Sequence, residues 1–155
     1  MPIRCEIVSQ DRLVFEGDAD IVILPGEAGE MGILPKHAPL LSTLKLGICT
    51  VRHGGQEEHF AIAGGIVEVQ PDIVTVMADA AENVLEIDVA RAEEARQRAE
   101  DYLKEGPPPD MDTYLAMEAA LHRSELRLKA VQRYRGRDAA RLPRMPGIED
   151  QGGAE

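Results

Sequence analysis

The chain has 155 residues, enough for one domain of ordinary size or for a small domain with an appendage. Its 17 Lys and Arg against 28 Asp and Glu leave a net charge of −11, which argues against a general nucleic-acid-binding protein, whose surface would be basic. Apolar residues make up 44% of the chain, enough for a packed core, whereas two Phe, three Tyr and no Trp supply little for stacking on bases.

Residues 1–87 alternate short apolar runs with turn residues, which is the pattern of many short β-strands. The pair Gly54–Gly55 adopts positive φ at little cost and predicts a hairpin turn. Further turns are expected at Asp11, Gly17, Pro25–Gly26, Gly64–Gly65 and Pro71–Asp72. The predicted strands are Ile3–Val8, Leu13–Glu16, Ala19–Leu24, Ile48–Arg52, His59–Ala63, Ile66–Val69 and Ile73–Met77. This arrangement indicates an antiparallel β-sandwich or a small barrel.

From residue 88 the apolar spacing becomes helical. Asp88 is expected to cap a helix that runs to about Lys104, because Asp accepts a hydrogen bond from the first free amides. Gly106 and the prolines at 107–109 should end this helix. Asp110 or Asp112 should cap a second helix. The apolar stripe of the first helix is Ala92, Ala95, Ala99 and Tyr102.

The second helix is expected to reach about Tyr134 and to end at Gly136. Its stripe is Tyr114, Met117, Leu121, Leu128 and Val131, with Ser124 in the gap. Because the first helix offers mostly alanine, the pair alone would be marginal and should dock on the sandwich or on another protein. The expected fold class is therefore α+β, with a β-sandwich over 1–87, an antiparallel helical hairpin over 88–141 and a flexible tail over 142–155.

The sequence holds no phosphate-loop, dinucleotide, nucleophile-elbow or zinc-protease motif, so no catalytic residues are assigned. His53 and His59 flank one turn but have no obvious further ligands, and no metal site is expected. Cys5 and Cys49 lack metal-ligand spacing and are interpreted as buried thiols in a reducing compartment. A binding or structural protein is favoured over an enzyme.

No apolar run approaches the ~20 residues that a membrane-spanning helix needs. The first residues also lack the apolar core of a signal peptide. The chain is thus expected to be soluble and to meet a membrane only through a partner.

Three blocks carry a resemblance to a known family. They are Gly29–Leu41 (GEMGILPKHAPLL), Ala61–Val69 (AIAGGIVEV) and Val74–Glu82 (VTVMADAAE). In order and spacing they closely resemble the epsilon subunit of bacterial and chloroplast rotary ATP synthases, over about residues 3–135. The resemblance implies a β-sandwich followed by a two-helix domain, in agreement with the architecture predicted from the residues.

The resemblance implies a non-catalytic rotor subunit that couples proton flow through the c-ring to ATP synthesis. In the family the sandwich lies at the foot of the gamma subunit and contacts the polar loops of the c-ring, and Glu30 and His37 fall in that region. Glu30 is expected to pair with basic c-ring side chains, the plain alternative being a solvated acid in a turn. Lys36 departs from the pattern, because the family often has glycine there. The implied location is peripheral, at the cytoplasmic face of the bacterial plasma membrane.

The segment Ile87–Ala92 matches the I/L-D-x-x-R-A element of nucleotide-binding epsilon subunits. The resemblance assigns possible nucleotide contacts to Glu82, Ile87, Asp88, Arg91, Ala92, Arg123 and Arg127. Arg123 and Arg127 are four residues apart on one helix face, so with Arg91 they are expected to surround a polyphosphate. No cofactor is required, and ATP would be a regulatory ligand. The alternative is an ordinary N-cap followed by a solvated helix face.

The end of the second helix is basic within an acidic chain. The resemblance suggests that, with the hairpin extended along gamma, this helix engages acidic loops of the catalytic alpha/beta subunits and blocks ATP hydrolysis. The residues expected to act there are Arg123, Arg127, Lys129, Arg133 and Arg135. A plain charged surface helix, a free-standing nucleotide sensor and nucleic-acid binding by this helix are the alternatives, and the acidic balance of the chain disfavours the last.

Overall fold

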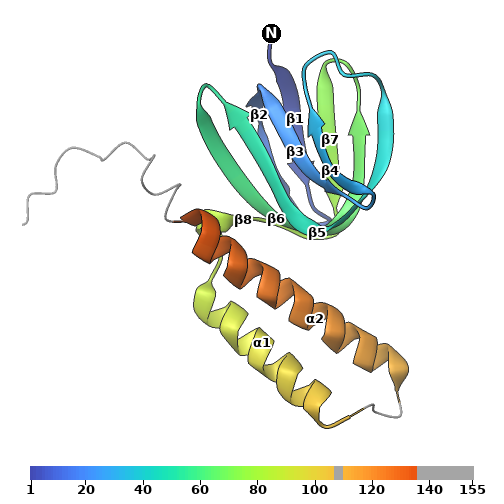
Figure 1. Ribbon diagram of the computed structural model, residues 1–155, viewed down its shortest axis with the longest axis vertical. Coiled ribbons are helices and arrows are strands. Elements are labelled where there is room, and N and C mark those ends of the chain that lie inside the picture. The colour runs from blue at the N-terminus through green and yellow to red at the C-terminus, as the bar shows by residue number, and fades with distance from the viewer. Residues whose placement is uncertain (107–109, 136–155) are drawn as a thin grey trace, which may run out of the picture.

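The structure is a computed structural model that describes residues 1–106 and 110–135. Its strands gather at one end and its two helices form a hairpin at the other (Figure 1). The strands are β1 (Ile3–Val8), β2 (Leu13–Ala19), β3 (Ile21–Gly26), β4 (Gly29–Ile33), β5 (Leu40–His53), β6 (Gln56–Val69), β7 (Ile73–Ala78) and β8 (Ala81–Asn83). A 3-10 turn (Val84–Glu86) leads to α1 (Val89–Lys104) and α2 (Met111–Ala130), and a π-helical turn (Val131–Arg135) follows.

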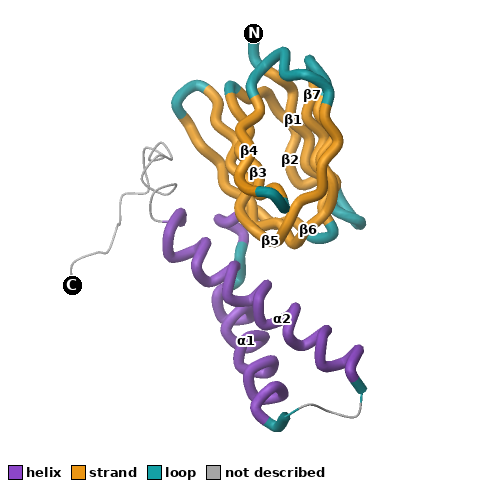
Figure 2. The backbone as a smooth tube through the Cα atoms, turned by 45° about the vertical axis from the view of Figure 1, so that its right-hand side comes forward, coloured by secondary structure: helices purple, strands orange, loops and turns teal. Residues whose placement is uncertain are grey.

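The strands form one sheet in the order β2-β1-β7-β6-β5-β3-β4, with β8 beside β6. Figure 2 shows this sheet curled on itself, with β5 and β6 curving across the end that faces the helices. The expected α+β class, a sandwich followed by two helices, is confirmed. The pairing is antiparallel in every described pair except one, because β1 and β7 run parallel. The sheet is therefore mixed, and the expectation of a purely antiparallel sandwich was wrong at this pair.

The core comes from the alternation of apolar residues along the strands. Ile3, Cys5 and Ile7 of β1 are fully buried, and so are Val74 and Val76 of β7, because every second side chain points inward. Phe60 fills the centre, and its ring centroid is 5.3 Å from that of Phe15.

Both cysteines are free and buried, as expected. Burial raises the pKa of the Cys5 thiol to about 12 and raises that of Cys49 as well. Because the thiolate is the reactive form, both groups are chemically quiet core residues.

Several strand boundaries differ from the predicted ones. The pair Gly64–Gly65 was expected to be a turn, but β6 continues through both residues. The two residues have φ of 79° and 131°, and a Cβ on Gly65 would lie 2.2 Å from the Met77 carbonyl oxygen. Glycine thus bends a continuous strand here instead of ending it. The strands β4 and β8 and the first half of β5 were not predicted.

Both predicted helix starts are confirmed. The Asp88 carboxylate accepts a hydrogen bond from the Arg91 amide at 3.1 Å, and that of Asp110 accepts one from the Asp112 amide at 3.1 Å. The Thr113 hydroxyl also donates to Asp110, and this hydrogen bond lowers the pKa of the Asp110 carboxyl.

The predicted stripes lie mainly between the two helices. Ala92, Ala99 and Ser124 are buried, while Tyr114, Met117, Leu121, Leu128 and Val131 are half-buried. The second helix leaves α-geometry at Ala130, before the predicted end. The prolines at 107–109, the stop at Gly136 and the tail over 142–155 lie outside the described residues.

Lys36 is the one non-glycine residue in the described part of the chain with φ in the left-handed region, at 61°. Its amide donates to the Pro71 carbonyl at 3.0 Å, which fixes the loop between β4 and β5. An L-residue with a Cβ is disfavoured in this conformation, and this gives a physical reason for glycine at the corresponding family position.

The variant Lys36→Gly should therefore be more stable than the natural chain, by about 0.5–1 kcal/mol in the free energy of unfolding. Urea unfolding followed by circular dichroism measures the difference. The control Lys36→Ala removes the same charge but keeps a Cβ, so it should show no gain. Equal stability of the two variants would contradict the proposed strain.

Candidate functional site

A pocket of about 650 Å³ lies between the sandwich and the helical hairpin. Its sandwich wall comes from the turn between β1 and β2, from β5 and β6, and from the segment 79–82. Its other wall comes from α2 and from Ala95 of α1. The volume is that of an ordinary small-molecule site, and the pocket is the first candidate for ligand binding.

An ion pair between two lining residues of this pocket connects α2 with the sandwich. The Arg127 guanidinium donates from Nε to Glu82 Oε2 at 2.9 Å and from Nη2 to Glu82 Oε1 at 3.2 Å. The two side chains are 28% and 27% exposed, so water screens the pair only in part. A two-pronged contact of this kind is stronger than an ordinary surface ion pair, and it fixes α2 on β8.

The contacts between the end of the hairpin and the sandwich are called here the joint. A second arginine, Arg135, takes part in it. Arg135 Nη2 donates to the carbonyls of Val84 at 3.0 Å, Leu85 at 3.3 Å and Ile87 at 2.6 Å. These carbonyls belong to the link between sandwich and hairpin, so Arg135 ties the end of the hairpin back to its start.

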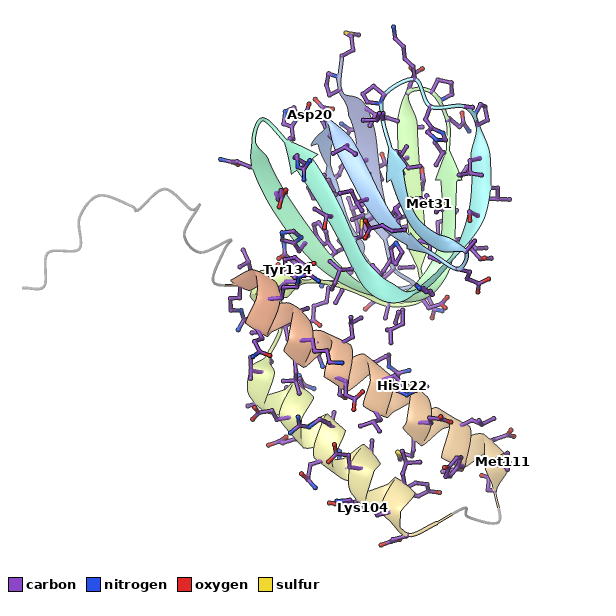
Figure 3. The ribbon with its side chains drawn as sticks, viewed as in Figure 1. Asp20, Met31, Lys104, Met111, His122 and Tyr134 are labelled. Atoms are coloured by element: carbon purple, nitrogen blue, oxygen red, sulfur yellow. The ribbon has the colours of Figure 1, made fainter. Side chains whose placement is uncertain are left out.

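An aromatic contact lies beside these arginines. The rings of His59 and Tyr134 stack, with centroids 4.1 Å apart and planes 26° from parallel. His59 is only 3% exposed, and its Nδ1 is 2.9 Å from the Thr50 hydroxyl. Figure 3 shows Tyr134 at the end of α2 that meets the sandwich, while Lys104 and Met111 lie at the far end of the hairpin.

A small apolar cluster completes the joint. Its buried members are Ala61, Val84, Ile87 and Ala130, and its half-buried members are Ile48, Leu126, Val131 and Tyr134. All members contributed by the hairpin come from α2 and the turn after it, so α1 is attached mainly through α2. The hairpin was expected to dock on the sandwich or on another protein, and this structure shows it docked on the sandwich.

The residues predicted to bind nucleotide divide into two groups. Glu82, Arg123 and Arg127 line the pocket together. The other four lie at the start of α1 and do not line it: Ile87 is buried in the joint, Asp88 caps the helix, Arg91 is exposed and Ala92 is buried. The structure thus gives two members of the I/L-D-x-x-R-A element a local folding role, the cap by Asp88 and the packing of Ile87.

The basic residues predicted to inhibit hydrolysis are not equally accessible. Arg127 and Arg135 are bound to the sandwich, as described above. The Arg133 guanidinium carbon lies 5.2 Å from the centre of the Tyr134 ring. Lys129 and Arg123 are exposed.

Glu30 lies near the start of β4, and His37 lies in the loop after the end of this strand. Glu30 is the second residue of the strand and is exposed. His37 follows the other end of the strand and is half-buried, with its Nδ1 2.6 Å from the Ala38 carbonyl oxygen. The two residues therefore do not form one compact site.

Two features of the structure are not predicted from the sequence. Arg12 lines the pocket from the sandwich side, and only the folded chain brings its turn to α2.

The second feature is a row of adjacent residues across five strands on the outer sheet face, called here the outer apolar row: Leu13, Val8, Met77, Ile66 and Thr43. Leu13, Ile66 and Met77 are 53%, 43% and 39% exposed. Each of these residues fits the ordinary alternation within its own strand. The row arises only when the strands pair, so the sequence gives no sign of it.

Metal binding has no support in the described part of the chain, where no group of three or more His, Cys, Asp or Glu is arranged to hold an ion. His53 lies beside Asp20, with 3.4 Å between Nδ1 and Oδ1, whereas His59 is buried against Thr50. The two histidines therefore belong to separate environments. Neither described helix is long and apolar enough to span a bilayer.

Two family models match the chain in succession. The β-sandwich domain of the ATP synthase delta/epsilon chain matches residues 2–84, and the long α-helix domain of the same chain matches residues 86–132. The ATP synthase epsilon chain of Acidithiobacillus ferridurans is 46% identical over 135 residues, which are 87% of this chain and 94% of that one. That of Dehalococcoides mccartyi is 42% identical over 133 residues, or 86% and 94% of the two chains.

Solved structures agree with these matches. A chain in the cryo-EM structure of the Euglena gracilis mitochondrial ATP synthase, which contains OSCP, F1 and the c-ring, superposes with a TM-score of 0.69 at 25% identity, over 84% of this chain and 81% of that one. A chain in the central stalk and c-ring structure of the Tetrahymena thermophila enzyme has a TM-score of 0.54 at 14% identity, over 84% and 97%, and shows the same fold.

A β-sandwich that carries a docked pair of helices, matched in both parts, defines a delta/epsilon chain of an ATP synthase. Within that class, the chain belongs to the ATP synthase epsilon family. This is a family of non-catalytic subunits, so the expectation of no catalytic residues agrees with the family.

The joint gives a direct test of how the hairpin is held. The variant Glu82→Gln should weaken docking by about 1–2 kcal/mol, because the partly buried Arg127 loses its counter-charge. Hydrogen–deuterium exchange should then be about five- to thirtyfold faster at the amides of residues 124–135. The control Glu93→Gln changes an exposed carboxylate on α1 and should leave that exchange unchanged. Equal exchange in both variants would mean that the ion pair does not hold the hairpin.

Proposed function

We propose that the chain is a rotor subunit in the central stalk of a proton-translocating ATP synthase, where it couples proton flow through the c-ring to ATP synthesis. The single observation that carries the proposal is the match of both domains, in order, to epsilon chains over nearly their whole length. The similarity to chains in structures that hold F1, the central stalk and the c-ring supports this place in the complex. The subunit then lies at the cytoplasmic face of the bacterial membrane and meets it only through the complex.

The outer apolar row is the surface proposed to meet the gamma subunit. Large exposed apolar side chains in adjacent strands form a continuous strip, which is uncommon on a surface that only water covers. The neighbouring row on the same face contains Glu68, Glu6 and Glu16, and the latter two are paired with Arg4. This face fits a partner that offers an apolar strip. Glu30 and His37 are proposed to contact gamma and the c-ring at two separate points of the foot.

The variant Ile66→Asp should therefore reduce co-purification with gamma at least tenfold, because a charge would enter the centre of an apolar contact. Ile66 is 43% exposed, so the fold should tolerate the change. The control Leu115→Asp places a charge on a side chain of α2 that is 54% exposed and should leave assembly intact. Normal assembly of Ile66→Asp would exclude this face as the gamma contact.

The hairpin is proposed to regulate hydrolysis by moving between two positions. In the docked position Arg127 and Arg135 are bound to Glu82 and to carbonyls of the link. In an extended position the same side chains would be free to meet acidic loops of the catalytic subunits, together with Arg123, Lys129 and Arg133. Because one set of arginines serves both positions, docking and inhibition exclude each other.

ATP is proposed as the ligand that selects the docked position. Arg123 and Arg127 supply charge for phosphate oxygens at the wall formed by α2, and the pocket lies between the two parts of the chain. A ligand that contacts both walls stabilises the docked state by mass action and so relieves inhibition. Glu82 lines the same pocket, whereas Ile87, Asp88, Arg91 and Ala92 lie outside the lining and are proposed to support the site by fixing the start of α1.

Removal of residues 88–155 should leave assembly and ATP synthesis in the reconstituted complex largely intact. ATP hydrolysis by the truncated complex should be higher at low ATP concentration, and the difference from the natural complex should shrink as ATP rises. Hydrolysis and synthesis rates measured across ATP concentrations test this. A truncated chain that fails to assemble would contradict the proposed division between coupling sandwich and regulatory hairpin.

A further inference from the structure

The pocket receives positive charge from both of its walls. Arg123 and Arg127 come from α2, and Arg12 comes from the turn between β1 and β2. Arg12 is far from the other two in sequence and lines the same pocket only in the docked arrangement. We infer that Arg12 is a third phosphate-binding residue of this pocket, so that a nucleoside triphosphate bridges the sandwich and α2. The inference rests on the proposed nucleotide site and deepens it.

The three arginines differ in how firmly they are held. Arg127 is bound twice by Glu82. Arg123 makes no hydrogen bond or ion pair with any residue that the structure describes. Arg12 forms a long ion pair with Glu86, with Nη2 3.6 Å from Oε2 and the two side chains 51% and 61% exposed, and it also lies near the Asp11 carboxylate, whose pKa it helps to lower. Such an exposed and long pair is weak, so Arg12 can exchange Glu86 for a phosphate oxygen at little cost.

The walls also fit the rest of a nucleotide. Six alanines line the pocket from β6, the segment before and into β8, and both helices: Ala61, Ala63, Ala80, Ala81, Ala95 and Ala120. These short apolar side chains give part of the lining an apolar character that suits a base, and the half-buried Leu46 extends it.

Carboxylates in the lining favour a nucleoside over a bare anion. Asp11, Asp79 and Glu82 line the pocket and would repel an isolated polyphosphate. They can accept hydrogen bonds from ribose hydroxyls, as acidic residues do in dinucleotide sites. Because Asp11 is next to Arg12 and Glu82 is paired with Arg127, acceptors for hydroxyls and donors for phosphates are interspersed in the lining, which suits a ligand that carries both groups.

The test is isothermal titration calorimetry of ATP with the full-length chain and five variants, one of which is Arg123→Gln. Arg12→Gln should weaken ATP binding about ten- to hundredfold, as expected for the loss of a charge-assisted hydrogen bond. Glu86→Gln should tighten it two- to fivefold, because it releases Arg12 without removing a residue of the pocket lining. This gain should vanish in the Arg12→Gln/Glu86→Gln double variant. The control Arg98→Gln, at an exposed arginine of α1 outside the lining, should bind as the natural chain does.

The possible failures are distinguishable. Unchanged binding by Arg12→Gln, together with loss of binding by Arg123→Gln, would overturn the inference and leave the proposed ATP site standing. Absence of ATP binding by the natural chain would overturn both. Binding of inorganic tripolyphosphate as tight as that of ATP would overturn the nucleoside assignment. Unchanged thermal unfolding of each variant without ATP shows that the fold is intact.

Discussion

The bidentate contact between Glu82 and Arg127 is the interaction on which the two-part architecture depends. The hairpin has little apolar surface of its own, since α1 buries chiefly alanines against α2. Its position is therefore set by the joint at the end of α2, where an ion pair, three carbonyl contacts from Arg135 and one stacked aromatic pair act together. Each of these contacts contributes little in net terms, because the groups exchange water for protein partners. A joint of this kind holds the hairpin and still allows it to be released.

The chemistry of the joint also explains how release can be controlled. Arginine binds carboxylates, carbonyls and phosphates with similar geometry, so one side chain can change partners without a change of fold. Glu82 and Arg127 line the pocket, so a ligand that binds the docked arrangement more tightly than the released one would favour docking. By linkage, the hairpin position must then change ligand affinity by the same factor that the ligand changes the hairpin position.

The surfaces proposed for coupling and for regulation lie on separate parts of the sandwich. The outer apolar row lies on a sheet face made by β1, β2, β5, β6 and β7, whereas the joint uses β8, the link to α1 and the edge of β6 near it. Because the two surfaces share no residue named for either proposed role, a change in the position of the hairpin need not disturb the proposed contact with gamma.

Much of this structure could be predicted from the sequence, because it depends on the chemistry of neighbouring residues. The caps at Asp88 and Asp110, the alternation in β1 and β7 and the helical spacing after residue 88 depend on near neighbours, and all were predicted correctly. The family followed from three motif blocks. The continuity of β6 through Gly64–Gly65 could not be predicted, because a glycine pair serves equally in a turn and in a bent strand. Nor could the outer apolar row, the parallel pairing of β1 with β7, or the presence of Arg12 opposite α2. These features join residues that are distant in sequence, and only the closing of the sheet and the docking of α2 bring them together.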